Sequence, residues 1–247
     1  MILGCRLDLL DADQATERIM TLAAQNAGAQ VVTLGTEMVV YAQHDDAFRA
    51  TVNKCALSLC DTIGLLAVAR RRGATLNERV TGVELIEHLC KQAAAVGVSV
   101  YFLGSAEGVA ADAAAILEAR FPGLRIAGVR NGYFKAADVP NIVDEIRASG
   151  ARLLFVGLGS PRQELWLSEH LAATGCGVGI GVGGSFDVIG GRVQRAPEVW
   201  RRLGLEWLYR LVKEPHRWRR QLALPQFVWL ILLDTLGVAS KKGTTSS

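Results

Sequence analysis

A basic, aromatic segment at residues 195–220, RAPEVWRRLGLEWLYRLVKEPHRWRR, carries the side chains best suited to bind an anion. Its eight basic and three acidic residues leave a net charge of +5, whereas the whole chain carries +3. Arginine can hold phosphate oxygens with two parallel hydrogen bonds, and Trp and Tyr favour a membrane interface. The segment therefore indicates a diphosphate ligand at a lipid surface. A solvated face, a nucleic-acid patch and a partner-binding helix are the alternatives.

The apolar stretch that follows, LALPQFVWLILL at residues 222–233, supports the membrane interpretation. It is too short to span a bilayer, which takes roughly 20 residues. We expect a helix that lies in the membrane interface or packs on a partner subunit, which would make the protein a homo-oligomer. An ordinary core helix is the alternative.

Asp61 is the candidate for proton transfer, because it ends an apolar run with no Lys or Arg beside it. A carboxylate in that place can act as a general base. The alternative is a helix N-cap, since the helical stretch 64–71 follows. Arg79, in the polar turn R-V-T-G, is either a substrate ligand or a surface salt-bridge partner.

Further polar or glycine-rich turns follow other apolar runs. Glycine lets a ligand approach the backbone, and the helix N-terminus after such a turn offers free N–H groups to an anion. A plain helix cap is the alternative at each turn. The candidate substrate-binding residues in these turns are Thr33, Gly104, Ser105, Gly159, Gln163 and Glu164.

The elements that must position these residues are short apolar runs alternating with amphipathic stretches. In the stretch 107–121, for example, Val109, Ala113 and Leu117 recur at steps of four on one helix face. The pattern predicts an α/β fold, with a mainly parallel, Rossmann-like sheet covered by helices and ligands bound at the carboxyl ends of its strands. The expected strands lie in residues 30–35, 56–61, 98–104, 125–132, 152–159 and 177–184.

Length and composition fit one globular core with an appendage. The chain has 247 residues, of which 50% are hydrophobic. We expect an α/β core at residues 1–194 and a basic, helical, membrane-proximal appendage at residues 195–247. The start of the chain lacks a basic stretch followed by a long apolar run, so we expect a cytoplasmic protein. The five cysteines include no C-x-x-C and are predicted to be reduced core residues, not zinc ligands.

Several familiar motifs are missing from the sequence. There is no G-x-x-x-x-G-K-[ST], and the G-x-G of Gly157 and Gly159 lacks the third glycine of a dinucleotide fingerprint. The D-x-D string Asp11-Ala12-Asp13 is not at an expected strand end, so we predict that cationic side chains, without a metal ion, face a diphosphate. A nucleotide-binding enzyme of another class, such as an NAD-dependent oxidoreductase, and a membrane-surface or nucleic-acid-binding adaptor are the competing functions.

Taken together, seven elements in this order resemble the WecG/TagA/CpsF family of glycosyltransferases, from about residue 5 to about residue 225. They are VVTLGTEMVVYA (31–42), CDTIGL (60–65), RVTG (79–82), FLGS (102–105), GLGSPRQELW (157–166), GVGGSFDVIGG (181–191) and the basic segment 195–220. The resemblance implies an inverting transferase without metal or other cofactor. It would move an N-acetylmannosamine-type sugar from UDP to an undecaprenyl-diphosphate-linked saccharide at the inner membrane face, with no nucleic-acid partner.

The resemblance also implies roles for individual residues. The family's proposed base matches Asp61. Its pocket threonine, arginine and glutamine match Thr33, Arg79 and Gln163, and the arginines of its carboxy-terminal appendage match Arg210, Arg217 and Arg220. This sequence departs from the family at Gly35, where T-L-G-T-E replaces T-x-N-P-E. The change removes a side-chain amide from the expected pocket and bears on the choice of donor sugar.

Overall fold

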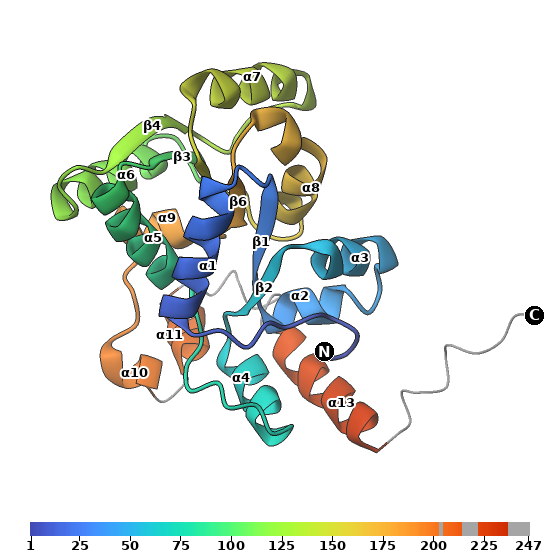
Figure 1. The fold of residues 1–247 in the computed structure, drawn as a ribbon. Helices are drawn as coiled ribbons and strands as arrows, with labels where there is room; N and C mark the ends of the chain where they lie inside the picture. The colour runs from blue at the N-terminus through green and yellow to red at the C-terminus, as the bar shows by residue number, and fades with distance from the viewer. Residues whose placement is uncertain (203–204, 214–221, 237–247) are drawn as a thin grey trace, which may run out of the picture.

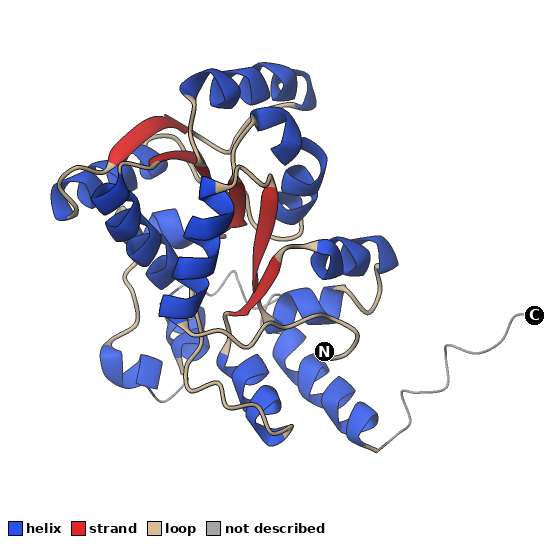
Figure 2. Ribbon diagram, viewed as in Figure 1, coloured by secondary structure: helices blue, strands red, loops and turns tan. Residues whose placement is uncertain are grey.

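A six-stranded, all-parallel sheet forms the centre of the molecule (Figures 1 and 2). The computed structural model describes residues 1–202, 205–213 and 222–236. The strands run in the order β2-β1-β6-β5-β3-β4. They are β1 (Ala29–Leu34), β2 (Leu57–Cys60), β3 (Ser99–Gly104), β4 (Arg125–Arg130), β5 (Leu153–Gly157) and β6 (Val178–Gly181). All six fall within the predicted apolar runs to within one residue, so the predicted strands are confirmed.

The inner strands read as continuous apolar runs because both of their faces are buried. In β3, Val100 and Phe102 face one buried cluster, whereas Tyr101 and Leu103 face another on the opposite side of the sheet. The helices supply the other half of each cluster. The predicted fold class, a Rossmann-like α/β sheet covered by helices, is therefore confirmed.

Helices cover both faces of the sheet (Figure 2). One face packs against α1 (Ala12–Ala24), α5 (Gly82–Val96), α6 (Val109–Arg120) and α9 (Ser185–Ile189). The clusters of the other face contain residues of α2 (Thr36–Tyr41), α3 (Asp46–Lys54), α4 (Ile63–Arg71), α7 (Val139–Ser149) and α8 (Arg162–Thr174), and a 3-10 turn (Ala136–Asp138) precedes α7.

Local sequence explains where several helices begin. The side chain of Asp11 accepts a hydrogen bond from the backbone N–H of Gln14, 2.8 Å away, so the first acid of the D-x-D string caps α1. In α6 the predicted Val109, Ala113 and Leu117 are all buried. A side-chain cap thus sets the start of α1, whereas the periodicity of α6 sets which face of that helix is buried.

The five cysteines are buried and unpaired, as predicted. Burial raises the pKa of Cys60, which directly precedes Asp61, to about 12. Its thiol therefore stays protonated near neutral pH, which removes it as a nucleophile beside the candidate base.

The described parts of the appendage form α10 (Glu198–Arg202), α11 (Glu206–Lys213) and α13 (Ala223–Thr235). Helix α13 packs against α2, with Phe227 only 3% exposed in a cluster shared with the core, while Trp229 on the outer side is 61% exposed. The expected interfacial helix therefore has one face docked on this chain and one apolar face open. The division at residue 194 stays a prediction.

Among the described residues, no helix is both long enough and apolar enough to cross a bilayer.

Candidate active site

The candidate active site is a cleft of about 310 Å³ over the carboxyl ends of four neighbouring strands, β2, β1, β6 and β5. Strand β6, the last in the chain, lies between β1 and β5. The loop that follows β6 therefore lies beside the loop that follows β1. Such reversals of strand order open a crevice in parallel sheets. Five of the predicted site residues line the cleft: Thr33, Asp61, Arg79, Gly159 and Gln163.

Asp61 is half-buried and is held at the N-terminal end of α5. Its backbone N–H donates to the carbonyl of Leu34, which extends the β1–β2 pairing by one residue. Its Oδ1 accepts from the backbone N–H of Gly82 at 3.3 Å. The N-cap of α4 is Thr62, and its side chain makes no capping bond. The predicted alternative, that Asp61 caps the helix after it, is thus wrong, and its carboxylate faces the cleft.

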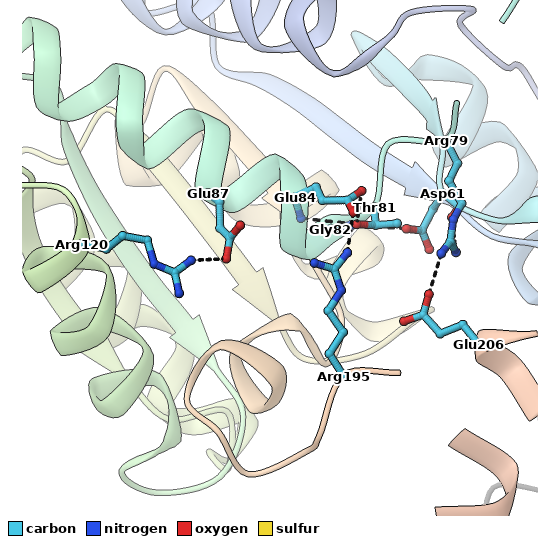
Figure 3. A network of polar contacts seen from close by, with 9 residues as sticks. All are labelled: Asp61, Arg79, Thr81, Gly82, Glu84, Glu87, Arg120, Arg195 and Glu206. Atoms are coloured by element: carbon cyan, nitrogen blue, oxygen red, sulfur yellow. Dashed lines mark hydrogen bonds and ion pairs between the residues drawn. The ribbon is translucent and has the colours of Figure 1, made fainter. Parts of the chain in front are cut away.

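Arg79 pairs with the appendage. Its Nη2 donates to Oε2 of Glu206 at 2.6 Å, and its Nη1 lies 3.5 Å from the backbone carbonyl of Asp61. Figure 3 shows these three side chains gathered beside Gly82. Burial opposes the charge on Arg79, but the hydrogen bond and charge of Glu206 outweigh it and raise the pKa of the guanidinium. The salt bridge expected as one alternative exists, but it lies inside the cleft and not on the open surface.

Thr33 and Gln163 are buried and fix the loop after β6. The hydroxyl of Thr33 donates to the carbonyl of Gly181 at 2.9 Å, and Oε1 of Gln163 accepts from the backbone N–H of Gly183 at 2.9 Å. Both side chains also line the cleft. Their hydrogen bonds to backbone groups hold the end of β6 and the loop after it in place along this wall of the cleft.

Glu164 lies behind Gln163 and does not line the cleft. It is fully buried, and its Oε1 accepts from Nε2 of Gln163 at 2.7 Å. Burial raises the pKa of this carboxyl group. Its position is that of a support for Gln163.

Gly104 and Ser105, at the end of β3, also lie outside the cleft lining. Gly104 has φ 144°, and a Cβ there would stand 2.4 Å from the carbonyl oxygen of Gly157, so only glycine fits between the strands. The Ser105 hydroxyl donates to Oδ2 of Asp187 at 2.9 Å. The structure thus gives both residues a role in shaping the β3 loop, and substrate binding by them stays a prediction.

The three arginines matched in the appendage are only partly covered by the structure. Arg210 belongs to α11, and only its backbone is described. Arg217 and Arg220 lie outside the described residues. Their expected role at the diphosphate stays a prediction.

The chain matches the model of the family described as "Glycosyl transferase WecG/TagA/CpsF family" over residues 1–241. It belongs to this family. It is also similar to the N-acetylglucosaminyldiphosphoundecaprenol N-acetyl-beta-D-mannosaminyltransferase of Bacillus spizizenii (strain ATCC 23059 / NRRL B-14472 / W23). The two are 37% identical over 212 residues, which cover 86% of this chain and 82% of the relative.

Membership of a glycosyltransferase family decides between the competing functions. The oxidoreductase and the adaptor are not supported, because the match covers both the core and most of the basic appendage. In this WecG/TagA/CpsF chain, as far as it is described, no three His, Cys, Asp or Glu side chains are grouped closely enough to hold a metal ion. Independence of metal ions stays a prediction.

Sequence reasoning missed several residues that line the cleft from the appendage side: Arg195, Glu206, Trp207 and Leu224. Arg195 pairs with Glu84 of α5 at 2.5 Å, and Glu84 also accepts from the hydroxyl of Thr81 at 2.8 Å (Figure 3). Glu206 was visible in the sequence, but it was considered only as one of three acids that lower the net charge of a cationic segment. Its pairing with Arg79 spans 127 residues of chain.

Proposed function

We propose that this chain transfers an N-acetylmannosamine-type sugar from UDP to an undecaprenyl-diphosphate-linked saccharide, with inversion at the anomeric carbon, during cell-envelope polysaccharide or teichoic acid synthesis. The observation that carries the proposal is the placement of Asp61 in the cleft, beside the guanidinium of Arg79. One carboxylate and one cation in the same cleft are the two charges that such a transfer needs. The name of the Bacillus spizizenii relative supports the choice of sugar and acceptor.

The chemistry follows from these two charges. The acceptor hydroxyl attacks the anomeric carbon as the bond from that carbon to the UDP oxygen breaks, and Asp61 takes the hydroxyl proton. The electron pair of the broken bond leaves with UDP, whose growing negative charge requires fixed cations. Arg79 stands beside the base, and Arg210, Arg217 and Arg220 are the further cations we assign to this task.

The membrane part of the proposal rests on α13. Leu224, in its first turn, lines the cleft, and beyond it Val228, Trp229 and Leu232 are exposed. An apolar helix face that begins at the cleft suits an enzyme whose acceptor carries a polyprenyl chain. We propose peripheral binding to the inner face of the cytoplasmic membrane, supported by the basic residues of the segment 195–220.

A transfer assay tests the proposed function. The purified full chain is incubated with a panel of UDP-sugars, including UDP-N-acetylmannosamine, UDP-N-acetylglucosamine and UDP-glucose, and a GlcNAc-diphosphate-lipid acceptor. We expect mass spectrometry to find acceptor extended by one N-acetylhexosamine, and NMR to find the inverted anomeric configuration. Equal use of all donors, or a retained configuration, would contradict the proposal.

The rate of transfer after chelation tests whether this mechanism uses a metal ion. Because guanidinium groups are proposed to face the diphosphate, EDTA should leave the initial rate within about twofold of the untreated rate. Activity that disappears with EDTA and returns with Mg²⁺ or Mn²⁺ would show that an ion does this work.

A further inference from the structure

We propose that Glu206 is an internal competitor of the donor diphosphate: it holds Arg79 while the cleft is empty and is displaced when the diphosphate binds. This inference rests on the proposed function, in which Arg79 serves the UDP leaving group. The contact that carries it is the pair between Nη2 of Arg79 and Oε2 of Glu206.

The geometry makes Glu206 a chemical stand-in for phosphate. Both side chains of the pair line the cleft, and they are only 20% and 13% exposed. An anionic oxygen therefore already lies at hydrogen-bond distance from a guanidinium that faces the substrate space. Phosphate and carboxylate oxygens bind the same fork of N–H donors, so they compete for it.

The charge balance of the cleft points the same way. Its described lining holds three carboxylates against two guanidinium groups, the acids being Glu37, Asp61 and Glu206 and the cations Arg79 and Arg195. A diphosphate entering this lining meets carboxylates as well as guanidinium groups. Displacing Glu206 from Arg79 removes one carboxylate from the path of the phosphates and frees guanidinium N–H groups for them.

The second ion pair between the core and the segment 195–213 differs from the first. Arg195 binds Glu84, which also accepts a hydrogen bond from the hydroxyl of Thr81 (Figure 3). Burial opposes the charge on Glu84, but the bonds from Thr81 and Arg195 outweigh it and lower the pKa of the carboxyl group. This pair uses no residue assigned to the substrate, so it can hold the chain to α5 while the Arg79–Glu206 pair exchanges.

Titration calorimetry with UDP on a double-mutant cycle tests the competition. Glu206→Gln keeps the shape of the side chain and removes its charge, so UDP should bind about fivefold more tightly than to the wild type. In an Arg79→Gln background the same change should alter affinity by less than about twofold, because the guanidinium for which Glu206 and the diphosphate compete has been removed. Arg79→Met, which also removes the charge, serves as a second background if the glutamine variant does not fold. Glu118→Gln, an exposed acid on α6 outside the cleft lining, is the control and should leave the affinity unchanged.

Two outcomes of the UDP titration overturn the proposal. Weaker or unchanged binding by Glu206→Gln would mean that Glu206 positions Arg79 or does nothing for the donor. Equal tightening in both backgrounds would reduce Glu206 to a general negative charge. Inorganic pyrophosphate is titrated in parallel: a Glu206 effect on pyrophosphate without any UDP binding would support the competition but reject UDP as the donor. No binding of either anion by any variant would reject both.

Discussion

The two walls of the cleft are held by different kinds of interaction. On the core wall, Thr33 and Gln163 are buried and bonded to backbone groups, and Asp61 is anchored by the N–H of Gly82. On the appendage wall, Arg195 and Glu206 reach the core through ion pairs between side chains. Backbone bonds fix a geometry, whereas ion pairs can exchange one anion for another. The difference suggests that the core wall carries the chemistry and the appendage wall responds to the charge of the ligand.

The largest effect should come from Asp61→Asn on the core wall. The amide oxygen can still accept from Gly82, but the side chain cannot take the acceptor's proton, so transfer should fall roughly 10²–10⁴-fold. Initial rates of sugar transfer measure this loss, and UDP calorimetry with a melting curve checks that binding and folding persist. Near-normal turnover would show that Asp61 is not the base and that the core wall does not carry the proton transfer.

A pair of substitutions on α13 should separate the docked face of the appendage from its open face. Phe227→Ala removes a ring that is 3% exposed and should lower the free energy of unfolding by about 3 kcal/mol. Trp229→Ala removes one that is 61% exposed and should change stability little, but it should weaken binding to anionic vesicles roughly tenfold.

Denaturant unfolding and vesicle sedimentation measure the two effects. The two variants serve as controls for each other, because they lie two residues apart on the same helix. Equal stability losses would show that α13 has no open face. Unchanged vesicle binding by Trp229→Ala would reject this helix as a membrane contact.

The contrast between the walls also explains how far the sequence could predict the molecule. Most of the strands were predictable because strands buried on both faces read as nearly unbroken apolar runs, whereas β4 lies at the sheet edge and is only partly buried. Asp61 was visible because a carboxylate ends such a run. The strand order was not predictable, since residues far apart in the chain pair to form it, and without it the end of β3 could not be separated from the four strand ends that form the cleft.

The appendage wall was harder to predict from the sequence, because it too is formed by residues that lie far apart in the chain. The pairing of Glu206 with Arg79 and the burial of Phe227 against α2 are both long-range contacts. Composition gave the charge and apolarity of this region but not its partners. Phe227 and Trp229 look alike in the sequence, and only packing against the core distinguishes them.

A smaller effect is expected from Glu164→Gln, behind the core wall. Burial raises the pKa of Glu164 above its ordinary value of 4.5 in the folded chain. Consider pH values between the pKa of Glu164 in the unfolded chain and its higher pKa in the folded chain. There the unfolded chain has lost the proton and the folded chain retains it, so the free energy of unfolding of the wild type falls as pH rises through that range. Each unit of raised pKa costs about 1.4 kcal/mol once both states are ionised.

Glu164→Gln should therefore be more stable than the wild type at pH 7, with a difference that vanishes near and below the ordinary pKa. Denaturant unfolding at a series of pH values measures this. Glu169→Gln, an exposed acid on the same helix, is the matched control and should show no such trend. A Glu164→Gln variant that is less stable at neutral pH would mean that the buried carboxyl stabilises the fold.

The smallest effect should come from Gly35→Asn, which restores on the core wall the amide that the family pattern carries. The backbone of Gly35 has φ −107°, which any residue adopts, and an added Cβ would lie at ordinary contact distance, 3.5 Å, from Cγ2 of Thr62. The substitution should therefore fold normally and place an amide in the cleft, where it can bind hydroxyl or acetamido groups of the donor sugar. We expect a roughly two- to tenfold shift in the ratio of kcat/KM between two UDP-sugars, the size of about one hydrogen bond, with UDP affinity unchanged. Gly35→Ala, which adds the Cβ alone, is the control for steric effects. If both variants shift the ratio equally, the space at Gly35 sets the preference; if neither does, this position does not touch the sugar, and the choice of donor lies with other residues of the cleft.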